Sequence, residues 1–167
     1  MKKHLLGALG LALHLVPSVA WTATLKIPVG EPLYSVDLPA GWTTDEVNDG
    51  ILGHSADEEV TIFFEATATK SVGELIQGAV DWLWEEDFRL DLSTEKTTRI
   101  SVAGMAWNKM SWVGRNEDGV EADISFLFGD LGRDKLAVIT YWTTTRAGAK
   151  DKAAIDGMLG SFKRSAK

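Results

Sequence analysis

The sequence predicts an α+β fold, in which two long helices pack on a mostly antiparallel β-sheet. Apolar and polar residues alternate along several short segments, and this alternation is typical of β-strands. Two longer segments instead carry their apolar residues on one helical face. The composition is 45% hydrophobic and 25% charged over 167 residues, which is an ordinary balance for a globular protein.

Residues 1–20 have the three-part pattern of a secretory signal peptide. Two lysines give a positive start, residues 5–16 form an apolar run, and Ser18-Val19-Ala20 supplies small residues for cleavage. The apolar run is shorter than the roughly 20 residues that a membrane span needs. We therefore expect cleavage after this motif, which leaves a single exported domain over residues 21–167 that is periplasmic or secreted.

Charge and residue types exclude several classes of function. Acidic residues number 24 and Lys plus Arg number 17, for a net charge of −7. A dedicated nucleic-acid binder needs a basic face, so we expect no nucleic-acid partner. There are no cysteines, which excludes disulfides, thiolate metal sites and cysteine nucleophiles. After the signal peptide, no apolar segment reaches the length of a membrane span.

The first half of the domain predicts three strands and a helix. The strands are expected over residues 33–38, 50–55 and 60–66, and the last of these shows the clearest alternation. Ser71-Val72-Gly73-Glu74 matches a capping box, in which the serine and glutamate side chains bind N–H groups at a helix start. We expect this helix to end near Glu86, which would otherwise place a charge on its apolar face.

The second half predicts four strands followed by a helix. Residues 136–142 are apolar at both parities, as in a strand that is covered on both faces. Four apolar residues at helical spacing form one stripe on the final helix: Ile155, Met158, Leu159 and Phe162. In chain order we expect strands at 99–102, 105–113, 120–128 and 136–142, turns at 116–119 and 129–133, and a helix at 147–162.

The segment from Tyr34 to Trp42 reads Tyr-Ser-Val-Asp-Leu-Pro-Ala-Gly-Trp, a strand that ends in Leu-Pro-x-Gly-Trp. It resembles the start of PsbP-like domains, the Mog/PsbP/DcrB type, and the order of elements over residues 30–164 is also similar. The resemblance implies a three-layer α/β/α sandwich with a mostly antiparallel sheet. It also implies an accessory protein that binds other proteins, with no shared catalytic residues. A DcrB-type lipoprotein would have a lipobox cysteine, which this sequence lacks.

One histidine, His54, remains after removal of the signal peptide. A Ser-His-Asp triad needs a histidine held between a nucleophile and a carboxylate. The segment His54-Ser55-Ala56-Asp57 has these residue types, but no Gly-x-Ser-x-Gly nucleophile elbow accompanies it. We expect a histidine in a loop or at a strand end. We assign no catalytic residue and expect a protein that is not an enzyme.

Metal and cofactor motifs are missing from the sequence as well. One histidine and no cysteine argue against a zinc site. Acidic and amide residues at 45–49 and 116–118 could ligate calcium, yet they precede glycines as in turns and lack the register of a calcium loop. No glycine-rich phosphate loop occurs. We therefore expect no metal site and no cofactor.

Seven tryptophans are the unusual feature of the composition. Trp82 and Trp84 flank the apolar face of the first helix, one at each edge, beside Asp81 and Glu85. At least one ring should be partly exposed, and an aromatic ring within a polar rim is typical of a protein interface. The alternative is that both rings cover the rim of the core. Four other tryptophans are expected in the core: Trp42, which follows a turn, and Trp107, Trp112 and Trp142 on predicted strands.

These observations favour an exported, non-enzymatic accessory or binding protein of the bacterial cell envelope, acting through protein-protein contacts at the residues around Trp84. The expected partner is another envelope protein, and the oligomeric state stays open. One alternative is a carboxylate-dependent hydrolase of glycans that uses the acidic runs at 57–59 or 85–87, although such runs are usually solvated surface. Another alternative is a small-ligand or calcium-binding domain.

Overall fold

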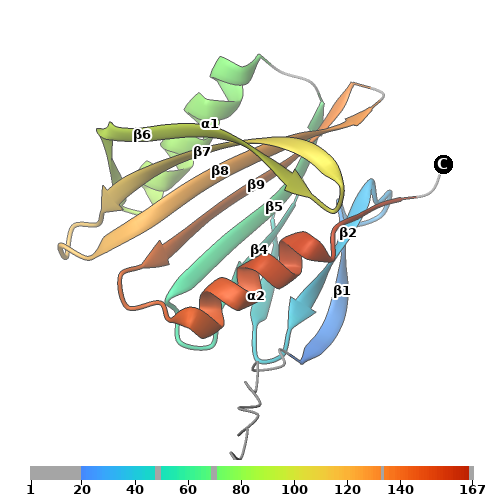
Figure 1. The fold of residues 1–167 in the computed structure, drawn as a ribbon, viewed down its shortest axis with the longest axis horizontal. Helices are drawn as coiled ribbons and strands as arrows, with labels where there is room; N and C mark the ends of the chain where they lie inside the picture. Colours follow the sequence, from blue (N-terminus) through green and yellow to red (C-terminus); the bar gives the residue numbers. More distant parts are fainter. Residues whose placement is uncertain (1–19, 48–49, 69–70, 133, 166–167) are drawn as a thin grey trace, which may run out of the picture.

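The computed structural model describes residues 20–165, apart from 48–49, 69–70 and 133. The expected signal peptide over residues 1–20 therefore lies outside the described residues, except for Ala20. Within the described part, the chain forms ten strands and two helices (Figure 1). In chain order they are β1 (Trp21–Ile27), β2 (Tyr34–Pro39), β3 (Thr43–Val47), β4 (Gly50–His54), β5 (Val60–Ala68), α1 (Val72–Glu85), β6 (Arg89–Val102), β7 (Met105–Arg115), β8 (Glu121–Gly132), β9 (Lys135–Thr144), α2 (Ala149–Gly160) and β10 (Lys163–Arg164).

The strands form two antiparallel sheets. The large sheet has seven strands in the order β3-β4-β5-β9-β8-β7-β6, and the small sheet has three in the order β1-β2-β10. Each strand pair whose register is described is antiparallel. The predicted α+β class with a mostly antiparallel sheet is therefore confirmed.

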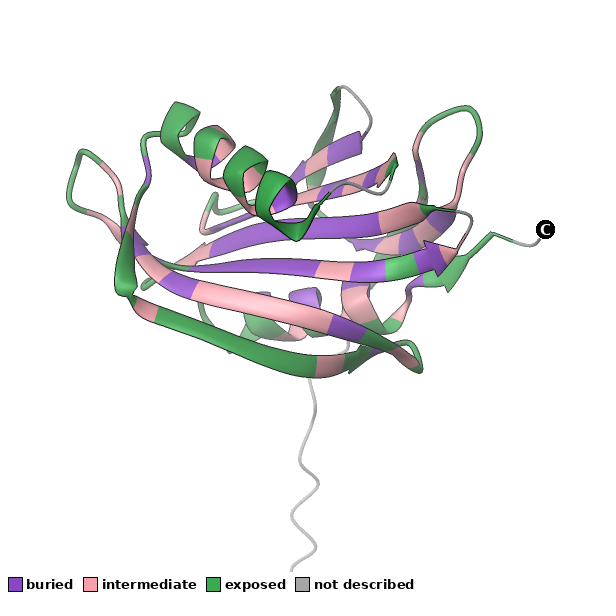
Figure 2. Cartoon of the chain, turned by 90° about the horizontal axis from the view of Figure 1, so that it is seen from above, coloured by how far each residue is buried: buried purple, intermediate pink, exposed green. Residues whose placement is uncertain are grey.

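The two helices lie on opposite faces of the large sheet (Figure 2). On one face α1 contributes Leu75 and Leu83 to the core, and on the other face α2 contributes Ile155 and Met158. The small sheet packs into the same core as α2, and Tyr34 of β2 is fully buried there. The expected three-layer α/β/α sandwich is therefore only partly observed. The layer on the α2 side consists of α2 and the small sheet, and not of a helix alone. None of the described helices is long and apolar enough to cross a membrane.

Strand β9 is covered on both faces, as its apolar pattern predicts. It lies between β5 and β8 in the large sheet. Ile139 and Tyr141 belong to the core on the α2 side, while Val138 and Trp142 belong to the clusters on the α1 side. A central strand packed by elements on both sides needs apolar residues at both parities.

Helix α1 begins and ends where the sequence predicts. The Ser71 Oγ accepts a hydrogen bond from the Glu74 N–H at 3.2 Å, and a Glu74 carboxylate oxygen accepts one from the Ser71 N–H at 2.9 Å. The capping box is therefore formed, and it satisfies two N–H groups that lack partners within the helix. The helix ends at Glu85, with Glu86 as its C-cap.

Helix α2 is shorter than the predicted 147–162. Gly148 is an extended N-cap, and its N–H donates to the Asp151 carboxylate at 2.8 Å. The helix ends at Gly160, and the ring of Phe162 lies beyond it, stacked on Tyr34 with centroids 4.8 Å apart. Phe162 thus enters the core from the segment that follows the helix. Its spacing from Ile155, Met158 and Leu159 is the same as in a longer helix, so periodicity alone does not show where α2 ends.

The alternation pattern does not predict β1, β3 or the first part of β6. All three are edge strands. Strand β3 is exposed along its whole length, and most residues of β1 and β6 are exposed as well. A strand without a buried face shows no alternation of apolar and polar residues, so these strands are not recognisable from the sequence and are identified only by their pairing in the sheet.

Gly129 lies inside β8 and not in a turn, which corrects the prediction of a turn over 129–133. A Cβ at this position would come within 2.5 Å of the Trp107 indole. The glycine therefore permits a close packing contact between neighbouring strands. Strand β8 continues to Gly132, whose φ of +76° is in the region that favours glycine.

Candidate functional site

The sequence-predicted binding residues lie at the C-terminal end of α1. Leu83 is 1% exposed and faces the sheet, and the two tryptophans precede and follow it. Successive helical residues are about 100° apart, so Trp82 and Trp84 point to opposite sides of Leu83. Asp81 and Glu85 are both exposed. The structure therefore keeps these residues on one helix end but gives the two rings different environments.

Trp82 belongs to the rim of the core. Its ring is half-buried, 5.4 Å from the ring of Phe63 and 5.1 Å from the ring of Trp142. Aromatic rings at such distances and tilted angles stabilise each other beyond the area that they bury. Trp82 thus covers the rim of the core, as in the alternative considered from the sequence, and its indole packs α1 against β5 and β9.

Trp84 is 56% exposed, which agrees with the prediction that at least one ring is partly exposed. The Arg89 guanidinium lies over the ring, 4.1 Å from its centroid, and one of its N–H groups donates to the Trp84 carbonyl at 3.3 Å. Such a cation–π contact contributes about 0.5–1 kcal/mol at an exposed site. The stack holds the indole in a defined orientation at the surface.

Acidic side chains surround this exposed indole. The last turns of α1 and the two residues after the helix carry exposed carboxylates and no basic side chain: Asp81, Glu85, Glu86 and Asp87. Arg89 forms an ion pair with Glu117 at 4.0 Å. We call Asp81, Trp84, Glu85 and Arg89 the Trp84 surface.

A groove on the opposite face of the large sheet is not predicted by the sequence. It has a volume of about 880 Å³ and lies between the first turns of α2 and strands β6–β9. The strand register brings one row of paired residues into it: Lys96, Ser111, Ser125 and Tyr141. Beside this row, the Lys109 ammonium donates to the Tyr141 hydroxyl at 3.1 Å.

In the sequence, the one indication of this groove is the alternation of polar and apolar residues along β8. Asp123 and Ser125 alternate with the apolar residues that face α1, a pattern that is also typical of a solvated sheet face. Ser125 is in fact only 4% exposed. The groove combines residues of several elements, so only the register and the position of α2 reveal it.

The His54 segment is not arranged as a catalytic triad. His54 ends β4, and its Nδ1 lies 3.2 Å from the Thr61 hydroxyl. The Ser55 hydroxyl donates to the Asp57 carboxylate at 2.6 Å, and this hydrogen bond holds the pKa of Asp57 below its ordinary value of 3.8. Histidine and serine therefore each bind a different partner. The position of His54 at a strand end agrees with the sequence-based expectation.

The two segments considered for calcium have different outcomes. Asp45 and Glu46 lie on β3, whereas residues 48–49 are outside the described residues. Asn116 forms a turn, because its backbone carbonyl accepts the Gly119 N–H at 3.0 Å and its side chain accepts the Val120 N–H at 2.8 Å. Among the described residues, no group of three or more His, Cys, Asp or Glu side chains is placed to hold a metal ion.

Comparison with known proteins finds similarity to solved structures. Neither a protein-family model nor a curated protein matches the chain. The solution structure of cyanobacterial PsbP (CyanoP) from Synechocystis sp. PCC 6803 superposes with a TM-score of 0.60 at 15% identity, over 96% of this chain and 99% of that one. The Ran-binding protein Mog1p of Saccharomyces cerevisiae gives 0.51 at 14% identity, over 88% and 96%.

A crystal structure from Bacteroides thetaiotaomicron VPI-5482 gives a TM-score of 0.56 at 11% identity. It covers 81% of this chain, which spans 46% of the Bacteroides protein. At these identities the comparisons establish the arrangement of the backbone and leave the function to be argued from the site. The chain therefore has the PsbP-like fold that its Leu-Pro-x-Gly-Trp strand resembles.

Proposed function

We propose that this chain is an exported, non-enzymatic accessory protein of the bacterial cell envelope that binds another envelope protein through the Trp84 surface. The observation that carries the proposal is the 56% exposure of Trp84, a large apolar ring held in place by Arg89. Tryptophan and arginine are enriched among the residues that dominate binding energy at protein interfaces. Burial of this ring against a partner would contribute hydrophobic free energy to binding, because the folded chain alone leaves the ring exposed to water.

The charge around the ring defines the chemistry of the partner. Asp81, Glu85, Glu86 and Asp87 are exposed carboxylates beside a single arginine. A complementary partner has an apolar pocket for the indole, bordered by lysine or arginine side chains. Opposite charges at the rim steer the encounter and make the association rate fall as salt rises.

Two other observations support the proposal. The pattern of residues 1–20 favours export. The yeast protein of this fold is a Ran-binding protein, which is an example of the same backbone arrangement in a protein that binds another protein. Neither observation names the partner of this chain.

The proposal is tested by cross-linking in the native envelope, followed by affinity capture of the tagged protein and mass spectrometry. A partner that the wild type captures reproducibly should be lost with Trp84→Ala. Val29→Ala is the matched control, because Val29 is an exposed apolar residue, 55% exposed, in the loop between β1 and β2. Val29→Ala should change the free energy of unfolding by about 0.5 kcal/mol or less, and Trp84→Ala should lower it by about 0.5–1 kcal/mol because it removes the cation–π contact with Arg89.

Arg89→Gln adds a second readout, because it removes the stacked cation and leaves the indole in place. We expect weaker capture because the indole loses the stack that orients it, and the remaining association should be more sensitive to salt because the surface around the ring becomes more acidic toward a basic partner. If Trp84→Ala captures the same partner as the wild type, the Trp84 surface is refuted as the binding site. If the wild type recovers no protein above background, the binding function itself is refuted.

A further inference from the structure

The groove opposite α1 arises because one face of the large sheet changes from apolar to polar along its strands. Leu127 and Ile139 are paired neighbours on β8 and β9, and both are fully buried in the core that α2 and the small sheet cover. One pleat further along the same face, the paired row consists of Ser111, Ser125 and Tyr141. Residues two apart on a strand share a face, so this polar row is the floor of the groove.

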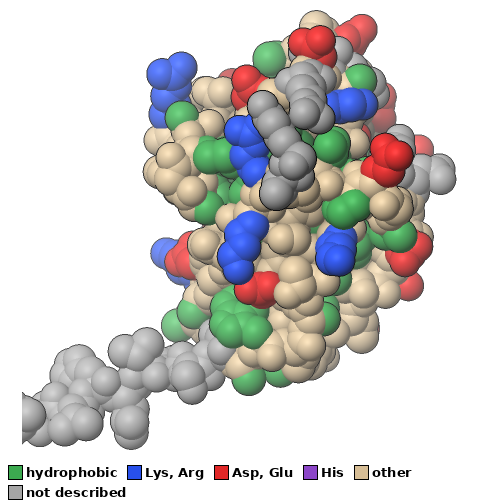
Figure 3. Space-filling view, turned by 90° about the vertical axis from the view of Figure 1, so that its right-hand side faces the viewer, with side chains coloured by type: hydrophobic (Ala, Val, Ile, Leu, Met, Phe, Trp, Pro, Cys, Tyr) green, Lys and Arg blue, Asp and Glu red, His purple; other side chains and the backbone are tan. Residues whose placement is uncertain are grey.

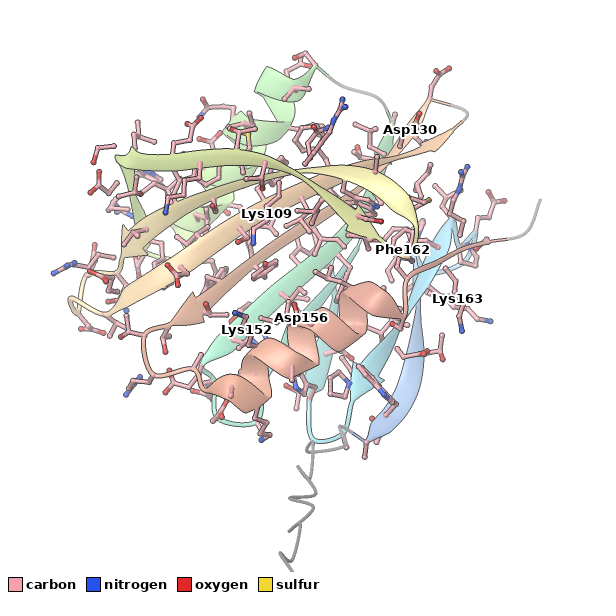
Figure 4. The ribbon with its side chains drawn as sticks, in the orientation of Figure 1. Lys109, Asp130, Lys152, Asp156, Phe162 and Lys163 are labelled. Carbon is pink, nitrogen blue, oxygen red and sulfur yellow. The ribbon has the colours of Figure 1, made fainter. Side chains whose placement is uncertain are left out.

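Three lysines from three different elements reach the groove: Lys96 on β6, Lys109 on β7 and Lys152 on α2. Figure 4 shows Lys109 and Lys152 directed toward the space between β7 and α2, with Asp156 beside Lys152. Among the described residues, none of the three ammonium groups forms an ion pair with a carboxylate. Lys109 is half-buried and donates to the Tyr141 hydroxyl.

The charge balance of the groove differs from that of the whole chain. Two carboxylates, Asp123 and Asp156, line it together with the three lysines, whereas the chain as a whole carries a net charge of −7. Concentration of lysines in a concave site with low-dielectric walls attracts anions from solution. The described contacts of the half-buried Lys109 ammonium are with the uncharged Tyr141 side chain, namely its hydroxyl and its ring, whose centroid is 5.6 Å away. An oxyanion beside this ammonium therefore gains a charge-assisted hydrogen bond.

We propose that this groove binds a small hydroxylated molecule that carries a carboxylate or phosphate group. The oxyanion lies between Lys109 and Lys152, and the Tyr141 hydroxyl positions the Lys109 ammonium. The hydroxyl groups of the ligand contact Ser111, Thr143 and the Asp123 carboxylate, which also line the groove. A volume of about 880 Å³ is within the range of small-molecule sites. An apolar ligand would remove water from the lysine ammonium groups without supplying a counter-charge.

This site is separate from the Trp84 surface, because α1 and α2 lie on opposite faces of the large sheet (Figure 2). The proposed protein contact and the proposed ligand site can therefore fail independently. A variant of the groove should leave partner capture through Trp84 unchanged, and Trp84→Ala should leave ligand affinity unchanged.

Isothermal titration calorimetry on the purified protein at low salt tests the proposal with four probes. Glucose 6-phosphate and gluconate carry hydroxyls and an oxyanion, glucose lacks the charge, and inorganic phosphate lacks the carbon-bound hydroxyls. We expect binding of the first two probes and none of glucose. Lys109→Gln and Lys152→Gln should each weaken binding about tenfold, the effect of losing one charge-assisted hydrogen bond.

Lys163→Gln is the matched control. Lys163 is an exposed lysine on β10, placed at the side of the molecule away from the groove (Figure 4). That side presents several Lys and Arg side chains (Figure 3), so the control also detects diffuse attraction of anions. Affinity within about twofold of the wild type is expected, because Lys163 is not among the residues that line the groove and the attraction between charges through water weakens with distance.

Three results would overturn the proposal. One is the absence of binding by glucose 6-phosphate and by gluconate at millimolar concentration, and another is equal weakening by Lys163→Gln and Lys109→Gln. The third is an equal affinity for inorganic phosphate and glucose 6-phosphate, because the hydroxyl groups of the ligand would then contribute nothing to binding. Lys152 is exposed on α2, so Lys152→Gln remains decisive if circular dichroism shows that Lys109→Gln does not fold.

Discussion

Replacement of Gly129 by alanine is expected to destabilise the fold more than an ordinary glycine-to-alanine change. The added Cβ would lie 2.5 Å from Cε2 and 2.6 Å from Cδ2 of Trp107, whereas ordinary contacts begin at 3.4 Å. The indole must therefore move by almost an ångström. Trp107 is only 1% exposed, and its ring meets Phe162 edge-on with centroids 5.1 Å apart, so it has little room. Overpacking of this kind costs about 1–3 kcal/mol.

Urea unfolding monitored by tryptophan fluorescence measures this cost. We expect Gly129→Ala to lower the free energy of unfolding by about 2–3 kcal/mol, with an unchanged m-value because the exposed surface is the same. Gly78→Ala is the matched control: Gly78 is on α1, and its added Cβ would meet nothing within 4 Å. There the same chemical change should stabilise by about 0.5–1 kcal/mol, since alanine is the better helix former.

A double-mutant cycle with Trp107→Phe tests whether the clash is the cause. The smaller ring makes room for the alanine, and the substitution gives up no described hydrogen bond, because the Trp107 Nε1 has no partner among the described residues. We expect a coupling energy of about 1–2 kcal/mol between the two substitutions. Stability of Gly129→Ala within about 0.5 kcal/mol of the wild type, or an absence of coupling, would refute this packing argument.

Three further predictions concern caps and titrating groups. Ser71→Ala removes the capping box of α1 and should cost about 1 kcal/mol in urea unfolding; an unchanged midpoint would contradict this. Burial, helped by the charge of Glu65, raises the pKa of Tyr34 well above 10.0, so the folded state holds the proton more tightly. Stability from this group is constant below about pH 10 and lost above it, and Tyr34→Phe should show a shallower alkaline fall in melting temperature. The Ser55 hydroxyl lowers the pKa of Asp57 below 3.8, so the carboxylate stabilises the fold above that pH and this gain disappears as pH falls through the folded pKa. Asp57→Asn should therefore melt below the wild type at neutral pH, with the gap closing in acid; a gap that is independent of pH would contradict this.

The Trp84 surface was partly predictable, because helix periodicity places two rings on either side of Leu83 but does not say which one is covered. The choice depends on what lies beside the helix in space. Trp82 meets Phe63 of β5 and Trp142 of β9, whereas Trp84 meets Arg89 at the start of β6. These contacts join residues that are separated by up to 60 positions in the chain, and no local pattern encodes them.

The sequence by itself determined the elements whose signals are local. The capping box of α1 depends on two residues three positions apart, and the buried strands β5, β8 and β9 show their apolar parity within ten or so residues. The Leu-Pro-x-Gly-Trp segment and the order of the elements together indicated a PsbP-like fold. Edge strands, the end of α2 and the role of Gly129 were not determined in this way.

Only the tertiary structure decided where polar side chains converge. Lys96, Lys109 and Lys152 read as ordinary surface lysines along the chain, yet strand register and the position of α2 bring them to one groove. The physical reason is that backbone periodicity is a short-range property, while a site depends on distances between elements. Those distances are set by packing contacts such as Tyr34 with Phe162, which form only when the whole core is assembled.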